Sequence, residues 1–301
     1  MYLSFMRFSI IVPFLNEEKY IEQCIKSLIN QNFDRDEYEI IFVDNGSNDK
    51  SIELVQKYPQ VKLIFENTPN VYAARNKALN KAKGKFIAFT DADCYVDRNW
   101  LTNLDHCLKD KQVAIVMGRR DFPNKKDVFL QTFADYENEK FFYTLKYYPK
   151  KFWFGFTNNL AIKKVVIDKV AGFRLLQVNG DIDLVQRVVS NNLGSVVYCP
   201  SAIIRHLEIN HPWDWLKKIY RYGYHNTGLQ NISEFSNLPV KVNLKIFQSM
   251  GGKQHYSLWR KFCALLALST GFIAYRIGSI QVRLSNQSII FENTTNHKQY
   301  K

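Results

Sequence analysis

Two aspartates spaced two residues apart, Asp91 and Asp93, follow the apolar run Phe86–Thr90. Both carboxylates of such a pair can face one ion when the segment is irregular, and hard oxygen ligands suit Mg²⁺ or Mn²⁺. The alternative is a solvated turn in which Asp93 caps the next helix. Their place directly after a predicted strand favours the metal-binding interpretation.

A second pair of acids, Asp181 and Asp183, stands at the start of a predicted helix. Acidic residues stabilise the first turn of a helix through its macrodipole, and that effect alone would explain both. The functional alternative makes Asp181 a general base that takes a proton from an acceptor hydroxyl. The residues alone leave these two interpretations about even.

Three further residues could bind parts of a ligand or a metal ion. Asp44 ends a predicted strand before the turn residue Gly46, and we expect it to be free to accept hydrogen bonds from a base or ribose. Arg75 could hold a phosphate bidentately, although a surface arginine without a partner is the simpler interpretation. His206 could complete a metal site with Asp93 if the chain folds back there, although a lone histidine is more often structural.

The elements that would position these residues alternate along the first third of the chain. Apolar runs predict strands, and residues with helical spacing predict helices between them. The strands are Phe8–Phe14, Tyr38–Val43, Val61–Phe65 and Phe86–Thr90, and the helices are Asn16–Asn30, Ser51–Tyr58 and Val71–Lys83. This alternation predicts an α/β fold with a Rossmann-like, mainly parallel sheet flanked by helices.

The predicted strands place polar residues at one edge of the sheet. In open sheets of this kind, ligands bind beyond the carboxyl ends of the strands. Asn16 and Glu17 follow the first strand, Asp44 ends the second, and Asp91 and Asp93 follow the fourth. We therefore expect these five side chains to converge on one ligand.

The pattern beyond residue 115 is weaker. We expect extended segments at Val113–Met117, Phe154–Ile162 and Val196–Cys199, the last stopped by Pro200, and helices at Asp181–Asn191, His211–Leu229 and Phe262–Val282. Residues 121–150 receive no assignment. We expect residues 231–257 to be loop-rich and the polar tail after the last helix to be mobile.

The composition limits the class of protein. The 301 residues are 46% hydrophobic with a formal net charge of +13. Such a chain can bury a core, which argues against wholesale disorder, and its charge favours an anionic partner. Five widely spaced cysteines without a C-x-x-C pair argue against disulfides or zinc and favour a reducing compartment. The apolar run Phe8–Leu15 is short and contains Pro13, so we interpret it as a strand and not as a signal peptide.

Several segments, in a fixed order, carry a resemblance to family 2 glycosyltransferases with the GT-A fold. They are Ser9–Glu18 (SIIVPFLNEE), Phe42–Asp49 (FVDNGSND), Ala73–Asn76 (AARN), Phe89–Cys94 (FTDADC), Gly155–Ile162 (GFTNNLAI) and Gly180–Leu184 (GDIDL). The resemblance covers about residues 6–230. It implies a glycosyltransferase domain over residues 1–230, with a nucleotide half at about 1–118 and an acceptor half at about 119–230. Residues 231–301 would form a C-terminal extension with an apolar helix at about 258–284 and a polar tail.

The resemblance also implies a role for each site residue. The donor would be a nucleoside-diphosphate sugar, and its nucleoside would be bound by Pro13, Asn16, Glu17 and Asp44. Arg75 would contact the diphosphate or sugar. Asp91 would hold the ribose or an outer water. Asp93, joined by His206, would ligate Mg²⁺ or Mn²⁺, which stabilises the charge of the leaving diphosphate. Asp181 would deprotonate the acceptor hydroxyl, and one in-line displacement would invert the anomeric carbon.

Two departures from the family pattern limit these expectations. The family often has an acidic pair where this chain has Gly180 and Asp181, so the assignment of the base rests on Asp181 alone. The chain also lacks the Q-x-x-R-W motif of processive polysaccharide synthases. We therefore predict transfer of one sugar per acceptor, the acceptor being a lipid-linked or cell-envelope glycan.

The C-terminal region favours peripheral attachment to an anionic membrane. The segment Phe262–Tyr275 has no charged residue, but a run of 14 is short for a span and suits an interfacial or packed helix better. Basic residues lie near tryptophan and tyrosine: Lys217, Lys218, Arg221, Arg260, Lys261, Arg276 and Arg283. This combination suits the inner face of the cytoplasmic membrane. The alternative is a helix packed on the domain with ordinary solvated lysines.

Three other functions fit the sequence less well. A sugar-1-phosphate nucleotidyltransferase would need a glycine-rich phosphate loop where this chain has Pro13–Asn16. A non-catalytic module that binds sugar nucleotides or glycans remains the main alternative. A nucleic-acid binder is suggested by charge alone, and the acids at the strand ends argue against it.

Overall fold

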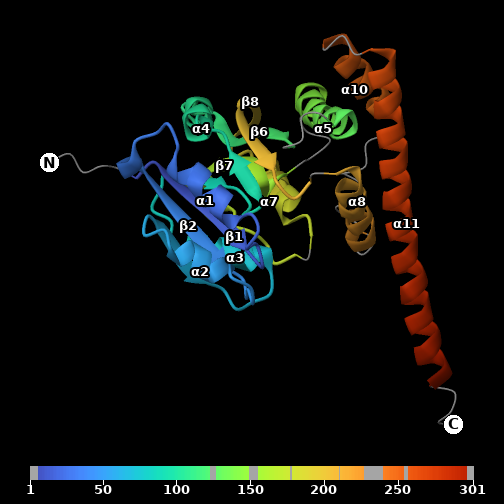
Figure 1. The fold of residues 1–301 in the computed structure, drawn as a ribbon, viewed down its shortest axis with the longest axis horizontal. Coiled ribbons are helices and arrows are strands. Elements are labelled where there is room, and N and C mark those ends of the chain that lie inside the picture. Colours follow the sequence, from blue (N-terminus) through green and yellow to red (C-terminus); the bar gives the residue numbers. More distant parts are fainter. Residues whose placement is uncertain are drawn as a thin grey trace. The chain divides into compact units, whose positions relative to one another are not determined.

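The computed structural model of the chain describes residues 6–122, 127–148, 155–176, 178–209, 211–226, 240–253 and 257–296 (Figure 1). The chain divides into two compact units. The first comprises Met1–Pro123 and Glu137–Glu208, and the second comprises Asn124–Tyr136 and Ile209–Lys301. All the site residues predicted from the sequence belong to the first unit.

The first unit is built on an eight-stranded sheet with the order β3-β2-β1-β4-β7-β6-β8-β5. One half consists of four parallel strands: β1 (Phe8–Phe14), β2 (Tyr38–Asp44), β3 (Val61–Phe65) and β4 (Phe86–Phe89). These bounds confirm the four predicted strands to within one residue. The register pairs Phe14 with Asp44 and Ile11 with Phe89, so the carboxyl ends of β1, β2 and β4 lie at one edge.

Three helices connect these strands: α1 (Ile21–Ile29), α2 (Ser51–Gln56) and α3 (Val71–Leu79). The predicted start of the first helix at Asn16 is wrong, because Asn16 has a left-handed backbone with φ of 57° that no helix accepts. Right-handed crossovers place α1 and α2 on one face of the sheet and α3 on the other. Ala74 and Ala78 of α3 are fully buried, which allows this helix to pack closely on β1 and β2.

The other half of the sheet is mixed. It contains β5 (Cys94–Val96), β6 (Val113–Asp121), β7 (Leu160–Lys163) and β8 (Ser195–His206). Strand β7 runs antiparallel to β4 and β6, and β5 runs antiparallel to β8. The extended segment predicted to begin at Phe154 starts outside the described residues, and Thr157–Asn159 is a 3₁₀ turn before β7.

The prediction that Pro200 stops a strand is wrong. Strand β8 continues through Pro200 to His206, and the register against β6 shifts between Gly118 and Arg119. Pro200 lies in this irregular stretch, where the ladder of backbone hydrogen bonds is interrupted and its missing N–H costs little. The longer strand carries His206 to a position opposite Cys94 of β5.

Helices also occupy segments that the sequence left open. In the unassigned stretch 121–150, Val128–Tyr147 forms α5, and the boundary between the two units falls inside it. Helix α4 (Trp100–Leu108) packs on β6 and β8, while α6 (Lys164–Lys169) follows β7. Helix α7 (Gly180–Ser190) confirms the helix predicted over 181–191 and carries both of its acids.

The second unit contains α8 (Pro212–Asn226), α10 (Val240–Lys253) and α11 (Leu258–Asn296). The loop-rich prediction for 231–257 is wrong over α10, where Val242, Ile246 and Met250 are buried at helical spacing. The last helix is also longer than predicted, because the polar stretch up to Asn296 continues it.

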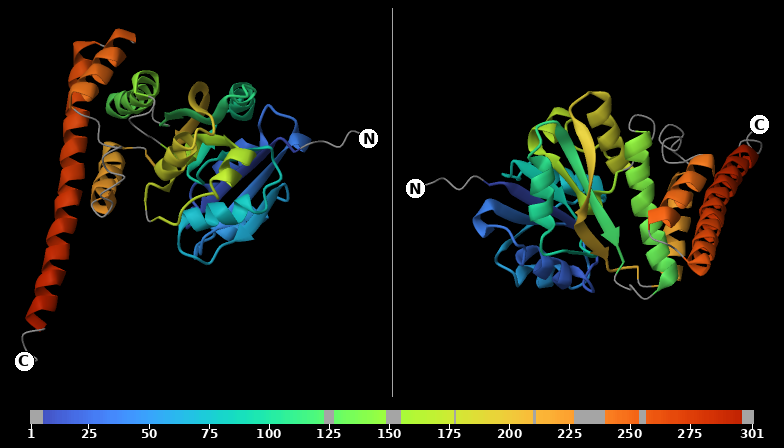
Figure 2. Two further views of the ribbon diagram at one scale, coloured as in Figure 1. Left: turned by 180° about the vertical axis from the view of Figure 1, so that it is seen from behind. Right: turned by 90° about the horizontal axis from the view of Figure 1, so that it is seen from above.

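Helices α8 and α11 lie side by side in every view (Figures 1 and 2). Their contact uses residues without side chains: a Cβ on Gly271 would meet the ring of Trp215, and one on Gly278 would meet the backbone of Tyr220. Within the described part of the chain, no helix combines the length and apolar character that crossing a bilayer requires.

Candidate functional site

Loops at the carboxyl ends of β1 and β2 are hydrogen-bonded to one another. The backbone N–H of Asn16 donates to Oγ of Ser47 at 3.0 Å, and its side-chain Oδ1 accepts from the N–H of Asn48 at 2.9 Å. The N–H of Glu17 donates to Oγ of Ser51 at 2.8 Å. These bonds fix Asn16 and Glu17 beside the turn after β2, so two segments far apart in sequence form one rigid rim.

Asp44 is not free in the way the sequence led us to expect. Its carboxylate accepts hydrogen bonds from the backbone N–H groups of Gly46 and Ser47, at 3.1 and 3.0 Å, and its side chain is buried. Gly46, with φ of 97°, forms the turn that directs these N–H groups toward the Asp44 carboxylate. Only the remaining lone pairs of Asp44 can accept from a ligand. Pro13 is buried on β1, paired with Val43 of β2.

Asp93 and His206 are brought together by strand pairing. The Nδ1 atom of His206 lies 3.2 Å from Oδ2 of Asp93, and both side chains are at least 90% buried. Antiparallel pairing places Cys94 opposite His206, and the N–H of Leu207 donates to the carbonyl of Asp93 at 2.7 Å. The fold therefore supplies the chain reversal that a shared site of these two residues requires.

The donor atoms of Asp93, Cys94 and His206 all lie within 4.8 Å of one another. Carboxylate oxygen suits Mg²⁺ and Mn²⁺, whereas imidazole is a ligand of transition metals and not of Mg²⁺. The thiol of Cys94 donates to Oδ1 of Asp93 at 3.4 Å. The carboxylate and imidazole thus fit a divalent transition metal such as Mn²⁺.

Arg75 is a buried residue with a defined partner, so the interpretation as an unpartnered surface arginine is wrong. Its Nη2 donates to Oδ1 of Asp91 at 2.8 Å, and only 4% of its side chain is exposed. The guanidinium lies over the rings of Tyr72 and Phe173, 5.6 and 5.9 Å from their centroids. Its Nε atom is buried and has no hydrogen-bond partner among the described residues.

The two aspartates of the D-x-D segment therefore have different neighbours. Asp91 faces Arg75 of α3, and Asp93 faces His206 of β8. The described cluster of possible metal ligands contains Asp93 and not Asp91. Asp91 is 34% exposed and keeps one oxygen that no described hydrogen bond occupies.

Asp181 lies at the first turn of α7, close to Arg75. Burial raises the pKa of the Asp181 carboxyl, and the Arg75 charge and the backbone N–H groups of Ile182 and Thr157 act in the opposite direction. Gly155 packs against the peptide of Asp181, where a Cβ would clash with its carbonyl group. A carboxylate that is partly desolvated in this way is a stronger proton acceptor than a solvated one.

Asp183 has a structural role. Its two carboxylate oxygens accept from Arg174 at 3.1 Å and from Nε of Arg187 at 2.8 Å, and its side chain is buried. Arg187 also donates to the carbonyls of Val170 and Gly172, which ties α7 to the segment before it. The two acids of the GDIDL segment are thus distinct, and only Asp181 is left for chemistry.

Sequence reasoning missed two residues that organise the site, Tyr72 and Asn159. The Tyr72 hydroxyl accepts from the N–H of Gly180 at 2.8 Å. Asn159 is fully buried, accepts from Nε1 of Trp100 at 2.8 Å and donates to the carbonyls of Arg119 and Ala202. Tyr72 stands directly before the AARN segment and Asn159 lies within the GFTNNLAI segment, but neither pattern indicates which partners these side chains bond.

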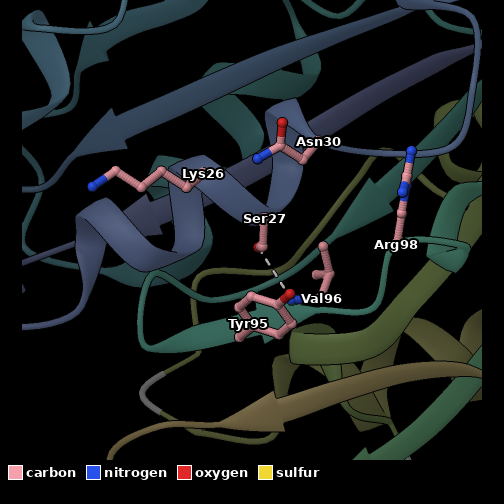
Figure 3. Close-up of a pocket in the computed structure, with 6 residues that line it drawn as sticks. All are labelled: Lys26, Ser27, Asn30, Tyr95, Val96 and Arg98. Carbon is pink, nitrogen blue, oxygen red and sulfur yellow. Dashed lines mark hydrogen bonds between the residues drawn. The ribbon is translucent and has the colours of Figure 1, made fainter.

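Two cavities among the described residues lie away from these side chains. One, of about 140 Å³, is lined by α1 and the β5 region and contains no predicted site residue; its lining residues are Lys26, Ser27, Asn30, Tyr95, Val96 and Arg98 (Figure 3). The other, of about 460 Å³, is bordered by lysines at the start of β4 and the end of β7. Lys26 and Arg98 point in different directions in Figure 3, so the first cavity gathers no convergent charge.

Comparison with known proteins places this geometry in context. Residues 9–179, more than half of the chain, match the family model described as Glycosyl transferase family 2. A poly(ribitol-phosphate) beta-glucosyltransferase of Bacillus spizizenii is 33% identical over 152 residues, which are 46% of this chain and 24% of the relative. The poly(ribitol-phosphate) beta-N-acetylglucosaminyltransferase TarS of Staphylococcus aureus is 38% identical over 101 residues, 32% of this chain and 18% of the relative. The chain thus matches less than a quarter of the length of either relative.

Solved structures share the fold. The mannosyltransferase PcManGT of Pyrobaculum calidifontis, in complex with GDP-Man and Mn²⁺, has a TM-score of 0.56 at 18% identity, over 95% of this chain and 80% of that one. TarS 1–349 of S. aureus in complex with UDP-GlcNAc has a TM-score of 0.51 at 18% identity, over 93% and 92%. These likenesses confirm the expected α/β architecture of the GT-A type.

Proposed function

Because the chain belongs to glycosyl transferase family 2, we propose that it transfers one sugar from a nucleoside-diphosphate sugar to a hydroxyl of a glycan or lipid-linked acceptor. The observation that carries the proposal is the presence of three groups in the first unit. These are the rim after β1 and β2, the Asp93–His206 pair, and Asp181 beside Arg75. Each supplies one requirement of sugar transfer: donor binding, charge stabilisation and a base.

The rim binds the nucleoside in this proposal. The base and ribose are bound by Asn16, Glu17 and the remaining lone pairs of Asp44. Pro13 of β1 contributes to the same nucleoside pocket. Donor nucleotides are present in two structures with the same fold, GDP-Man in PcManGT and UDP-GlcNAc in TarS, which supports a nucleotide at this edge. Arg75 is the cation for the diphosphate or sugar in this proposal, and its ion pair with Asp91 keeps it beside a partly exposed carboxylate.

Asp93 and His206 hold the divalent metal in this proposal, and Mn²⁺ fits the mixed oxygen and nitrogen donors better than Mg²⁺. When bound, the metal neutralises charge on the diphosphate leaving group. Asp91 orients the ribose or an outer water, and its ion pair with Arg75 keeps both side chains in place. The Mn²⁺ in the PcManGT complex supports this choice.

Asp181 is the general base. Its carboxylate takes the proton of the acceptor hydroxyl while the acceptor oxygen bonds to the anomeric carbon. The bond from that carbon to the diphosphate oxygen breaks in the same displacement, and the nucleoside diphosphate leaves with the electron pair. Because one displacement occurs, the configuration at the anomeric carbon inverts. The absence of a Q-x-x-R-W segment from the sequence supports transfer of a single sugar.

Peripheral binding to an anionic membrane is the second part of the proposal. Residues 209–301 hold 12 Lys or Arg against 3 Asp or Glu, so they carry +9 of the net charge of +13. Helix α11 exposes large apolar side chains at Trp259, Phe262, Phe272 and Ile273, each more than half exposed. An exposed apolar face next to basic residues suits an interface of anionic lipids. This would hold the enzyme at the inner face of the cytoplasmic membrane, near lipid-linked acceptors.

The experiment that tests the proposal is release of nucleoside diphosphate from a panel of sugar nucleotides, with and without Mn²⁺. We expect metal-dependent turnover of one donor, accelerated by its acceptor and lost in Asp93→Asn. Binding of a donor with no turnover, under every acceptor tried, would instead favour the non-catalytic module. Long polymer made from donor alone would contradict single-sugar transfer.

A further inference from the structure

Helix α3 holds the segment that leads into α7. The side chain of Asn76 donates to the carbonyl of Phe173 at 2.8 Å and accepts from its N–H at 2.9 Å. Asn70, which caps α3 through the N–H groups of Tyr72 and Ala73, also donates to the carbonyl of Leu176 at 2.9 Å. Two asparagines of α3 therefore fix this segment at two points before it reaches Asp181.

Tyr72 makes a third attachment. Its hydroxyl accepts from the N–H of Gly180 at 2.8 Å, and its ring stacks on Phe173 at 5.6 Å with an angle of 26° between the planes. A Cβ on Gly180 would lie 2.6 to 2.8 Å from the ring of Tyr72, so the ring packs directly on the glycine. Because α7 begins at Gly180, this contact determines where the first turn of the helix starts.

We propose that Tyr72 is a positioning residue for Asp181, which fixes the first turn of α7 against the helix that carries Arg75. The inference rests on the function proposed above. Tyr72 acts through the peptides of Gly180 and Asp181, whose backbone N–H groups face its hydroxyl. Asn179, immediately before that peptide, has φ of 61°, a left-handed conformation that asparagine adopts more readily than most residues.

The groups around Asp181 explain why a small displacement of its carboxylate would affect the rate of sugar transfer. Arg75 and Tyr72 face it from α3, and the N–H of Thr157 faces it from the turn before β7. Loss of the Tyr72 hydroxyl leaves the N–H of Gly180 buried without its acceptor, which favours movement of the first turn. A base displaced by about 1 Å can lose roughly two orders of magnitude in rate.

The test compares two variants that each remove one buried tyrosine hydroxyl. Tyr72→Phe keeps the ring that stacks on Phe173 and packs on Gly180. Tyr38→Phe is the matched control, because Tyr38 of β2 is equally buried and its hydroxyl donates to the carbonyls of Leu28 and Ile29 outside the site. For both variants kcat, acceptor KM, nucleoside-diphosphate Kd and amide hydrogen exchange over residues 180–184 are measured.

We expect Tyr72→Phe to lower kcat at least tenfold, with the nucleotide Kd within twofold of wild type, and to speed amide exchange over residues 180–184. Tyr38→Phe should reduce stability and leave kcat and that exchange unchanged. Wild-type kcat and exchange in Tyr72→Phe would overturn the inference while leaving the proposed function intact. Absence of turnover in the wild type would overturn the proposed function instead, and the exchange rates would still decide the role of Tyr72.

Discussion

His206 and Asp93 lie 3.2 Å apart, from Nδ1 to Oδ2, at the ends of two strands that are distant in sequence. The antiparallel pair β5 and β8 holds them in register, and both side chains are buried. A carboxylate and an imidazole fixed in this way are preorganised for a divalent ion, since little movement is needed to bind it. The pairing of β5 with β8 therefore determines how the side chains of Asp93 and His206 lie relative to one another.

Removal of either partner should weaken metal binding. We expect Asp93→Asn and His206→Ala to lower the affinity for Mn²⁺ together with a nucleoside diphosphate by about tenfold or more, because each loses one ligand. Calorimetry with Mn²⁺ and UDP or GDP measures this.

Asp105→Asn is the control for the metal variants, because Asp105 is a buried acid that pairs with Arg7 away from the site. It should leave Mn²⁺ affinity unchanged. Wild-type Mn²⁺ affinity in both Asp93→Asn and His206→Ala would remove these residues from the metal site.

Loss of the Arg75 charge should destabilise the first unit. Arg75→Met leaves Asp91 without its partner and removes the cation from the rings of Tyr72 and Phe173. We expect the free energy of unfolding to fall by about 1–3 kcal/mol, less than for a fully buried pair because Asp91 is partly exposed.

Urea unfolding measures this difference, with Lys164→Met as the control. Lys164 forms an exposed pair with Asp168 on α6, and its loss should cost less than about 0.5 kcal/mol. If both variants lowered the free energy of unfolding equally, burial of Arg75 would not increase the contribution of its ion pair to stability.

Asp181→Asn should stabilise the protein at high pH. Burial raises the pKa of the Asp181 carboxyl above the value of about 3.9 that it has in the unfolded chain. The stability that comes from keeping this carboxyl protonated is therefore fully present below the unfolded pKa, and it is lost as pH rises through the folded pKa. Asparagine does not ionise. We therefore expect a higher Tm than wild type at pH 8 and no difference near pH 3.5, measured by calorimetry; a lower Tm at pH 8 would contradict the raised pKa.

The apolar face of α11 should determine membrane binding. We expect the triple variant Trp259→Ser, Phe262→Ser, Ile273→Ser to bind vesicles of phosphatidylserine and phosphatidylcholine at least tenfold more weakly than wild type. Wild-type binding should also weaken as salt is raised, because the last 93 residues are strongly basic.

Val165→Ser is the control for the membrane variants, since Val165 is equally exposed in the first unit. Its vesicle affinity should equal that of wild type. If the wild type sediments no more with anionic than with neutral vesicles at low salt, the membrane proposal fails.

The sequence predicted the edge of the sheet well, because strand patterns are local. Each parallel strand is mainly apolar, and the polar residue at or after its end marks where the chain leaves the core. The same reasoning placed Asn16, Asp44 and Asp91 at one edge without any knowledge of tertiary contacts.

What the sequence could not predict depends on contacts between distant segments. Arg75 looked like a surface residue because neither the rings of Tyr72 and Phe173 nor the carboxylate of Asp91 could be placed against it. The separate roles of Asp181 and Asp183 follow from two arginines that reach only Asp183. Helix α10 was missed because its buried positions are few and its surroundings polar.

The most direct test of the account compares two aspartates on one turn of α7. Sugar transfer and nucleoside-diphosphate affinity are measured for Asp181→Asn and Asp183→Asn, below the unfolding temperature of each. We predict that Asp181→Asn lowers kcat at least about 100-fold with nucleotide affinity retained, while Asp183→Asn lowers Tm and keeps kcat within a few-fold of wild type. Transfer at the wild-type rate by Asp181→Asn would contradict the proposed mechanism.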